Sequence, residues 1–151
     1  MLIKYLIFAT WLLIASCTVN PLLEQTAYYQ KETLKPYDDV LAELQIAISE
    51  QNFRITGHSR VGKVIRNRGS TGFPDYDTLQ FCNLTHARKL LSLSPQAVRY
   101  MPCNVVTYFY QGKTIVNVRL LPTDSKNPEL NLFAKEMNKK MKQIVDFAVE
   151  E

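Results

Sequence analysis

The chain has 151 residues, of which 46% are hydrophobic and 21% charged. This is the size and composition of one globular domain, and it excludes a disordered chain. The formal net charge of +4 is too small to predict a nucleic-acid-binding surface, so we expect no nucleic-acid partner.

The first 16 residues have the pattern of an export signal. Lys4 gives a positive start, and residues 5–14 form a nearly unbroken apolar run. About ten apolar residues are enough for the hydrophobic region of a signal peptide, whereas a bilayer-spanning helix needs about 20. Residues 14–17, Ile-Ala-Ser-Cys, resemble the bacterial lipobox.

The lipobox resemblance implies that Cys17 carries a diacylglyceryl group and becomes the first residue after cleavage. Two or three acyl chains anchor a protein stably, because each buried CH₂ contributes about 0.8 kcal/mol. Thr18 follows the cysteine where an inner-membrane retention signal has Asp, which favours the outer membrane, facing the periplasm. A plain signal peptide, or an uncleaved anchor with an incidental cysteine, remains the alternative.

Residues 17–26 are expected to form a lipid-anchored tether, and residues 27–151 the domain. Asp38 or Asp39 is placed to cap the first helix, and Gly57 to end the second strand. In chain order the patterns predict a strand over 27–34, a helix from the cap at 38 or 39 to about 51, a strand over 53–56, a short helix over 60–68, a strand over 79–83, a short helix over 85–93, strands over 104–110 and 114–121, and a helix over 129–149.

The last three elements give the clearest patterns. Gln111-Gly112 lies between two strands rich in β-branched and aromatic residues, which predicts a hairpin. The final helix has a regular apolar stripe, with four lysines off it that form either a solvated face or a face touching phospholipid headgroups: Lys135, Lys139, Lys140 and Lys142. We therefore expect a single small α+β domain with an antiparallel sheet of about five strands and two long helices on one face.

Two cysteine-containing strings stand out in the domain. Residues 82–91 read CNLTHARKLL, and residues 102–106 read PCNVV, directly before the hairpin. Over about residues 27–149 the chain resembles the domain of unknown function 302 family, whose pattern has Cys-Asn, an Ala four residues after that Asn, and a Pro-Cys-Asn-Val string. Leu84 departs from the Pro frequent in the family, and no role is carried over to His86.

The resemblance implies a TATA-binding-protein-like α+β fold and a tendency to form homodimers. The family has no established activity, so the resemblance predicts the fold and leaves the function open.

Three interpretations of Cys82 and Cys103 compete. They can form a disulfide in an oxidising compartment, where closing a loop of about 20 residues contributes about 3 kcal/mol. Relatives with the same strings outside such compartments speak against this, and the thiols can instead pack as small apolar groups. As a third option they form a redox, sulfur-handling or metal site, with His86 as a third ligand. Asn83 and Asn104 are expected to satisfy backbone groups at strand ends.

The segment 54–68 contains six basic residues and no acidic one, and it can bind a small anion or lie in solvent. The basic residues are Arg54, His58, Arg60, Lys63, Arg66 and Arg68. Asp75 and Asp77 flank Tyr76 in an expected loop, where carboxylates commonly cap the backbone, although they can also pair as acid and base.

These patterns contain no catalytic signature, so the leading hypothesis is a non-enzymatic binding or accessory lipoprotein of the cell envelope. It would dock a small ligand or protein near Cys82 and Cys103, with Asn83, His86 and Asn104 as neighbours, and without a metal or cofactor. The alternative is a thiol-based redox, sulfur-handling or metal-binding protein. A third option is a structural envelope subunit that dimerises through its sheet.

Overall fold

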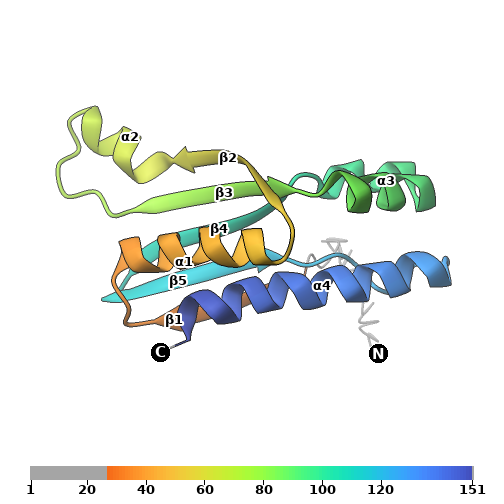
Figure 1. Cartoon of the computed structure of the whole chain (residues 1–151). Helices are drawn as coiled ribbons and strands as arrows, with labels where there is room; N and C mark the ends of the chain where they lie inside the picture. Colours follow the sequence, from red (N-terminus) through yellow and green to blue (C-terminus); the bar gives the residue numbers. More distant parts are fainter. Residues whose placement is uncertain (1–26, 151) are drawn as a thin grey trace, which may run out of the picture.

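The computed structural model describes residues 27–150 (Figure 1). The predicted signal peptide and tether lie outside the described residues. The elements, in chain order, are β1 (Tyr28–Thr33), α1 (Tyr37–Glu50), β2 (Arg54–Arg60), α2 (Val61–Asn67), β3 (Tyr76–Cys82), α3 (Leu84–Leu93), the 3₁₀ turn η1 (Pro95–Tyr100), β4 (Cys103–Tyr110), β5 (Lys113–Arg119) and α4 (Pro128–Val149).

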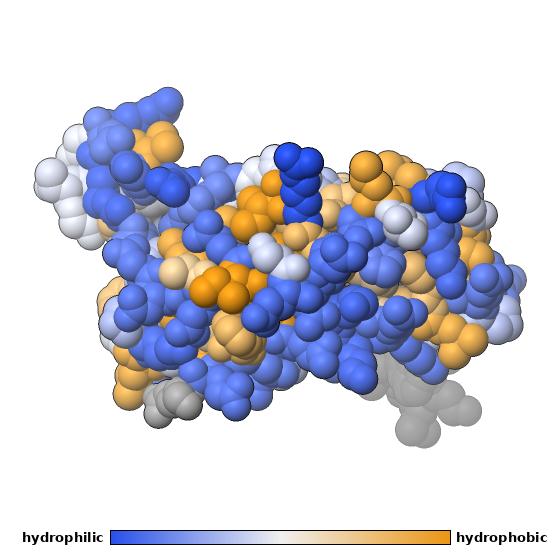
Figure 2. Space-filling model, in the orientation of Figure 1, coloured by the Kyte–Doolittle hydropathy of each residue, from blue (hydrophilic) through white to orange (hydrophobic). Residues whose placement is uncertain are grey.

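One antiparallel sheet forms the centre of the domain, in the order β1-β5-β4-β3-β2. Helices α1 and α4 lie side by side across one face of it (Figure 1). This confirms the predicted α+β class, the five strands and the two long helices on one face. Their outward surface is mostly hydrophilic (Figure 2). None of the helices within residues 27–150 combines the length and the apolar character that a membrane span requires.

The core lies between this helix pair and the sheet. Alternate strand residues such as Leu79, Val105 and Val116 point toward the apolar faces of the helices, because side chains alternate along a strand. Leu44 of α1 and Ile144 of α4 are fully buried against these strand residues. The predicted hairpin is also confirmed, with a two-residue turn in which Gln111 and Gly112 both have positive φ, as a type I′ turn requires.

The ends of three elements differ from the sequence prediction. Helix α1 begins after Pro36, which makes no side-chain cap, so Asp38 and Asp39 lie inside its first turn. Gly57 does not end β2, since the strand continues to Arg60 through an irregularity between Ile55 and Gly57. Strand β3 begins at Tyr76, three residues early, which moves Asp77 from the expected loop into the sheet.

Candidate functional site

Two pockets lie at opposite ends of β3. The first holds the cysteines singled out in the sequence: Cys82 ends β3 and Cys103 begins β4. Both are half-buried and unbridged in the structure, and both line one small, mainly apolar cavity of about 30 Å³ together with His86, Phe133 and Met137. The structure thus brings Cys82, Cys103 and His86 to one pocket, while the predicted disulfide stays a prediction.

The Cys103 thiol is protected from ionisation. Burial, followed by the nearby Cys82 thiol, raises the pKa of Cys103 from its ordinary 9.0 to about 11. A thiol with that pKa is almost entirely protonated at neutral pH, and the thiolate is the reactive form. Cys103 is therefore a weak nucleophile and a weak metal ligand in this state.

The neighbours of the cysteines have structural contacts. Asn83 caps α3 by accepting a hydrogen bond from the His86 backbone N–H at 3.1 Å, and it donates to the Asn52 carbonyl at 2.8 Å. The His86 ring lies between Phe53 and Phe133, with ring centroids 5.9 and 6.1 Å away.

Asn104 does not line the thiol pocket, although it lies in a smaller cavity beside Cys103. The three-ligand arrangement considered for Cys82, Cys103 and His86 is not formed: within residues 27–150, no three His, Cys, Asp or Glu side chains gather to hold a metal ion.

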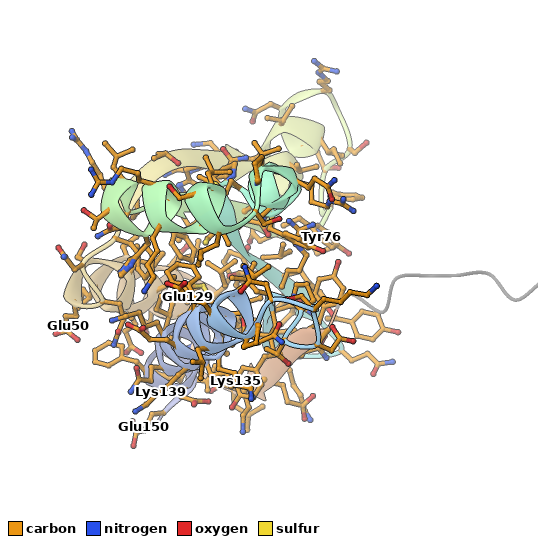
Figure 3. All side chains as sticks on the ribbon, turned by 90° about the vertical axis from the view of Figure 1, so that its right-hand side faces the viewer. Glu50, Tyr76, Glu129, Lys135, Lys139 and Glu150 are labelled. Atoms are coloured by element: carbon orange, nitrogen blue, oxygen red, sulfur yellow. The ribbon has the colours of Figure 1, made fainter. Side chains whose placement is uncertain are left out.

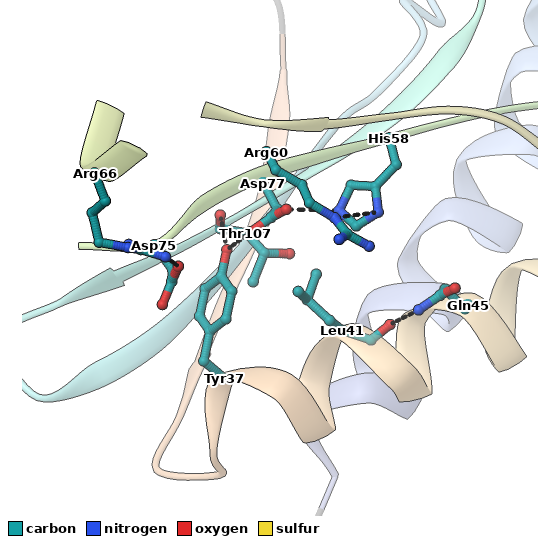
Figure 4. Close-up of polar contacts among 9 residues, drawn as sticks. All are labelled: Tyr37, Leu41, Gln45, His58, Arg60, Arg66, Asp75, Asp77 and Thr107. Carbon is teal, nitrogen blue, oxygen red and sulfur yellow. Dashed lines mark hydrogen bonds and ion pairs between the residues drawn. The ribbon is translucent and has the colours of Figure 1, made fainter. Parts of the chain in front are cut away.

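The second pocket is built around a buried carboxylate. Asp77 is 6% exposed on the helix-covered face of β3. Its Oδ1 lies 2.6 Å from Nε2 of His58, and its Oδ2 accepts a hydrogen bond from the Tyr37 hydroxyl at 2.8 Å (Figure 4). The same hydroxyl lies 2.9 Å from the Thr107 carbonyl. The Asp77 carboxylate therefore ties β3 to α1 and β2, the Tyr37 hydroxyl extends the network to β4, and the burial of the carboxylate is compensated by hydrogen bonds.

The network continues outward through His58 to Arg60. Arg60 Nε donates to Nδ1 of His58 at 3.3 Å, so Nδ1 is an acceptor and Nε2 carries the proton directed at Asp77. Burial and the hydrogen bond to Asp77 raise the pKa of Tyr37, which keeps this phenol a donor. The contacts run in the order Tyr37, Asp77, His58 and Arg60, with Asp77 buried, Tyr37 and His58 partly buried and Arg60 exposed (Figure 4).

A polar cavity of about 390 Å³ opens beside this network, between α1 and the β2–α2 segment. That volume lies in the range of small-molecule sites. Arg66 is tied down at the end of α2, because it donates to Asp75 at 2.5 Å and to the Phe73 carbonyl at 2.6 Å. Arg60 and Lys63 are exposed at the rim, and neither has a carboxylate partner in the described part of the chain.

Sequence reasoning singled out these basic residues but missed the pocket. Asp77 was assigned to a loop, because an acid in the core-facing phase breaks the apolar alternation that marks a strand. The available signal was that Asp77 lies two residues before Leu79 and four before Phe81, on the same face of a strand, while Tyr76, Thr78 and Gln80 occupy the other face. An acid continuing that phase points to a buried, partnered carboxylate.

These elements define a class, a small α+β domain with a five-stranded antiparallel sheet backed by two helices. The family model described as "Domain of unknown function DUF302" matches residues 29–148, so the chain belongs to this family. The chain is also similar in fold to a solved structure, an uncharacterized conserved DUF302 protein from Bacillus stearothermophilus. The two share 18% sequence identity with a TM-score of 0.70, over 80% of this chain and 97% of that one. No curated protein matches.

Proposed function

We propose that this protein is a lipid-anchored accessory protein of the cell envelope whose domain binds a small ligand with an anionic group. The anchor is Cys17, and the binding site is the polar pocket lined by Tyr37, His58, Arg60 and Lys63. The proposal places the protein at the outer membrane, facing the periplasm. The homodimer implied by the family resemblance is a further prediction.

The observation that carries the binding proposal is how Arg60 is held. Its Nε is fixed on His58, which is itself fixed on the buried Asp77. The terminal nitrogens of the guanidinium have no protein partner in the described residues, and Arg60 lines the same cavity as Lys63. A guanidinium fixed in this way matches a carboxylate, phosphate or sulfate group.

The acids of the pocket favour a ligand with one anionic end. Asp75 is neutralised by Arg66, and both Asp77 oxygens are occupied by hydrogen bonds. Asp38 remains as an acid lining the pocket, so a polyanion fits less well than a small molecule with a single anionic group.

The binding proposal is tested on the chain from Thr18 onward, which lacks the lipid-bearing cysteine. Inorganic phosphate and acetate are titrated while the His58 ring and Arg60 side-chain signals are followed by NMR. We expect saturable shifts with either anion and none with ethylamine.

Arg60→Gln is expected to weaken the anion binding by roughly 10- to 150-fold, since a charge-assisted hydrogen bond contributes about 1.5–3 kcal/mol. Arg88→Gln, an exposed change on α3, is the matched control and should leave the affinity unchanged. Equal shifts in the wild type and in Arg60→Gln, or shifts with the amine alone, contradict the proposal.

Lipidation is tested separately on the full chain expressed in a bacterium with labelled palmitate. We expect label in the wild type and a mature mass that starts at a lipidated Cys17, and no label in Cys17→Ser. A mature wild-type protein without acyl mass contradicts the anchor and leaves the pocket untouched.

Thiol chemistry is the second candidate, because Cys82 and Cys103 line the same pocket. An intact-mass count of alkylated thiols, on the chain without Cys17 expressed in the periplasm, decides it. Two thiols that react without unfolding support thiol or metal chemistry. Thiols that react only after reduction show a structural disulfide, and thiols that react only after unfolding show buried packing groups.

A further inference from the structure

The tether enters the domain beside a basic side of α4. The Ala27 carbonyl accepts a hydrogen bond from the Leu120 N–H at 2.8 Å, which fixes the start of the domain at the edge of the sheet. Ala27 lines one open groove together with Lys135, Lys139 and Lys142. The chain that leads to Cys17 therefore leaves the domain next to these three lysines.

These lysines follow one another at helical spacing on the exposed side of α4. Positions 135, 139 and 142 lie on one side because residues three and four apart are neighbours on a helix. Figure 3 shows Lys135 and Lys139 on the side of α4 turned away from α3. Leu132, on the same side, is 67% exposed. Lys140 differs, since it is half-buried and lies 3.4 Å from the Gln51 side chain.

Strand β1 extends the same basic surface. The ammonium groups of Lys31 and Lys142 both lie over the Tyr29 ring, 5.6 and 5.3 Å from its centre. Asp124 and Asp146 are the acids that line the groove, and Asp146 is engaged by the Tyr29 hydroxyl at 2.6 Å. Positive charge is therefore in excess on this surface.

We infer that the surface formed by Lys31, Lys135, Lys139 and Lys142 rests on the anionic phospholipid headgroups of the membrane that holds the anchor. The inference rests on the proposed lipidation of Cys17. The ten residues 17–26 span at most about 35 Å when extended, so an anchored domain stays close to the bilayer. The domain can turn the surface where this segment joins it toward the membrane without stretching the segment. That surface carries the lysines, whose positive charge is opposite to that of anionic headgroups.

The first test uses the lipid-free chain from Thr18 and vesicles of phosphatidylcholine, with or without roughly one-third phosphatidylglycerol. We expect co-sedimentation with the anionic vesicles only, weakened by added salt. A lysine near such a surface contributes about 1 kcal/mol, or about fivefold in affinity. Lys135→Gln, Lys139→Gln and Lys142→Gln together should therefore weaken binding about a hundredfold.

The matched control removes three exposed charges elsewhere, at Arg54, Arg68 and Arg88, each replaced by Gln. It should bind within a fewfold of the wild type. No binding of the wild type to the anionic vesicles, or equal losses in both triple variants, overturns the inference.

The second test uses the lipidated full chain in the same anionic vesicles and measures acylation of each lysine by mass spectrometry. Lys135, Lys139 and Lys142 should be protected relative to detergent micelles, while Lys63 and Lys113 should not be. Protection found in whole envelopes but absent in vesicles indicates a protein or cell-wall partner and overturns the inference. Failure of lipidation appears separately as absence of the acyl mass, so the two proposals fail independently.

Discussion

The two ends of β3 bury functional groups by opposite means. At the beginning of the strand, Asp77 is buried with a hydrogen bond to each oxygen, and those bonds reach α1 and β2. At its end, Cys82 meets Cys103 in an apolar cavity that makes few demands on hydrogen bonding. A charged group can be buried only with a network that holds several elements, whereas a thiol packs like a small apolar group. The polar end should therefore be sensitive to single substitutions, and the thiol end tolerant of them.

Asp77→Ala should give the largest effect and tests the polar end directly. It leaves His58 and Tyr37 with lost hydrogen bonds at a mostly buried position, so the free energy of unfolding should fall by about 3–4 kcal/mol in a urea titration. Asp75→Ala is the matched control, because the Asp75–Arg66 pair is 41% and 32% exposed and contributes about 0–1 kcal/mol. Equal losses in the two variants would remove the distinction between a structural network and a surface pair.

The thiol end of β3 should lower the free energy of unfolding at high pH, through ionisation of Cys103. The pKa of Cys103 is raised from 9.0 to about 11, so folding favours the protonated thiol. This contribution is fully present below pH 9 and is lost as the pH rises from 9 to 11. Two pKa units correspond to about 2.7 kcal/mol in all, of which about 2 kcal/mol is lost between pH 9 and 11.

Cys103→Ala isolates this contribution from other alkaline effects. The stability difference between wild type and variant should shift by about 2 kcal/mol toward the variant between pH 9 and 11, measured by urea unfolding at each pH. A constant difference across that range would show that Cys103 is exposed to water or already bridged to Cys82.

Gly62→Ala sharpens the comparison at the polar end, where α2 packs closely on the segment before β3. A Cβ at Gly62 would lie 2.4 Å from the Pro74 carbonyl oxygen and 2.8 Å from the Tyr76 nitrogen, both backbone atoms. Overpacking of this kind should lower the free energy of unfolding, measured by urea titration, by about 1–2 kcal/mol. Gly57→Ala is the control, since its Cβ meets only the movable Gln80 side chain. A larger loss for Gly57→Ala would show that α2 has room to shift.

The sequence predicted most of the fold, because its long periodic segments agree with the structure. The apolar stripe of α4 and the Gln111-Gly112 turn specify local conformations that tertiary packing supports. The start of β3 could not be predicted in the same way, since a core-facing acid makes sense only beside His58 and Tyr37, which are distant in sequence. Polar networks are set by tertiary contacts, so sequence patterns located the thiols better than the polar pocket.

Asn83→Ala should have the smallest effect and tests whether the residue beside Cys82 is structural. Asn83 caps α3 and also holds the Asn52 carbonyl, and loss of a cap lowers stability by about 1 kcal/mol. Asn104→Ala is the matched control: Asn104 likewise follows a cysteine, but its side chain has no hydrogen-bond partner within residues 27–150. Urea unfolding should separate the two variants by that amount while the alkylation rate of Cys82 stays the same in both. A changed Cys82 rate in Asn83→Ala, with little loss of stability, would instead assign Asn83 to the thiol site.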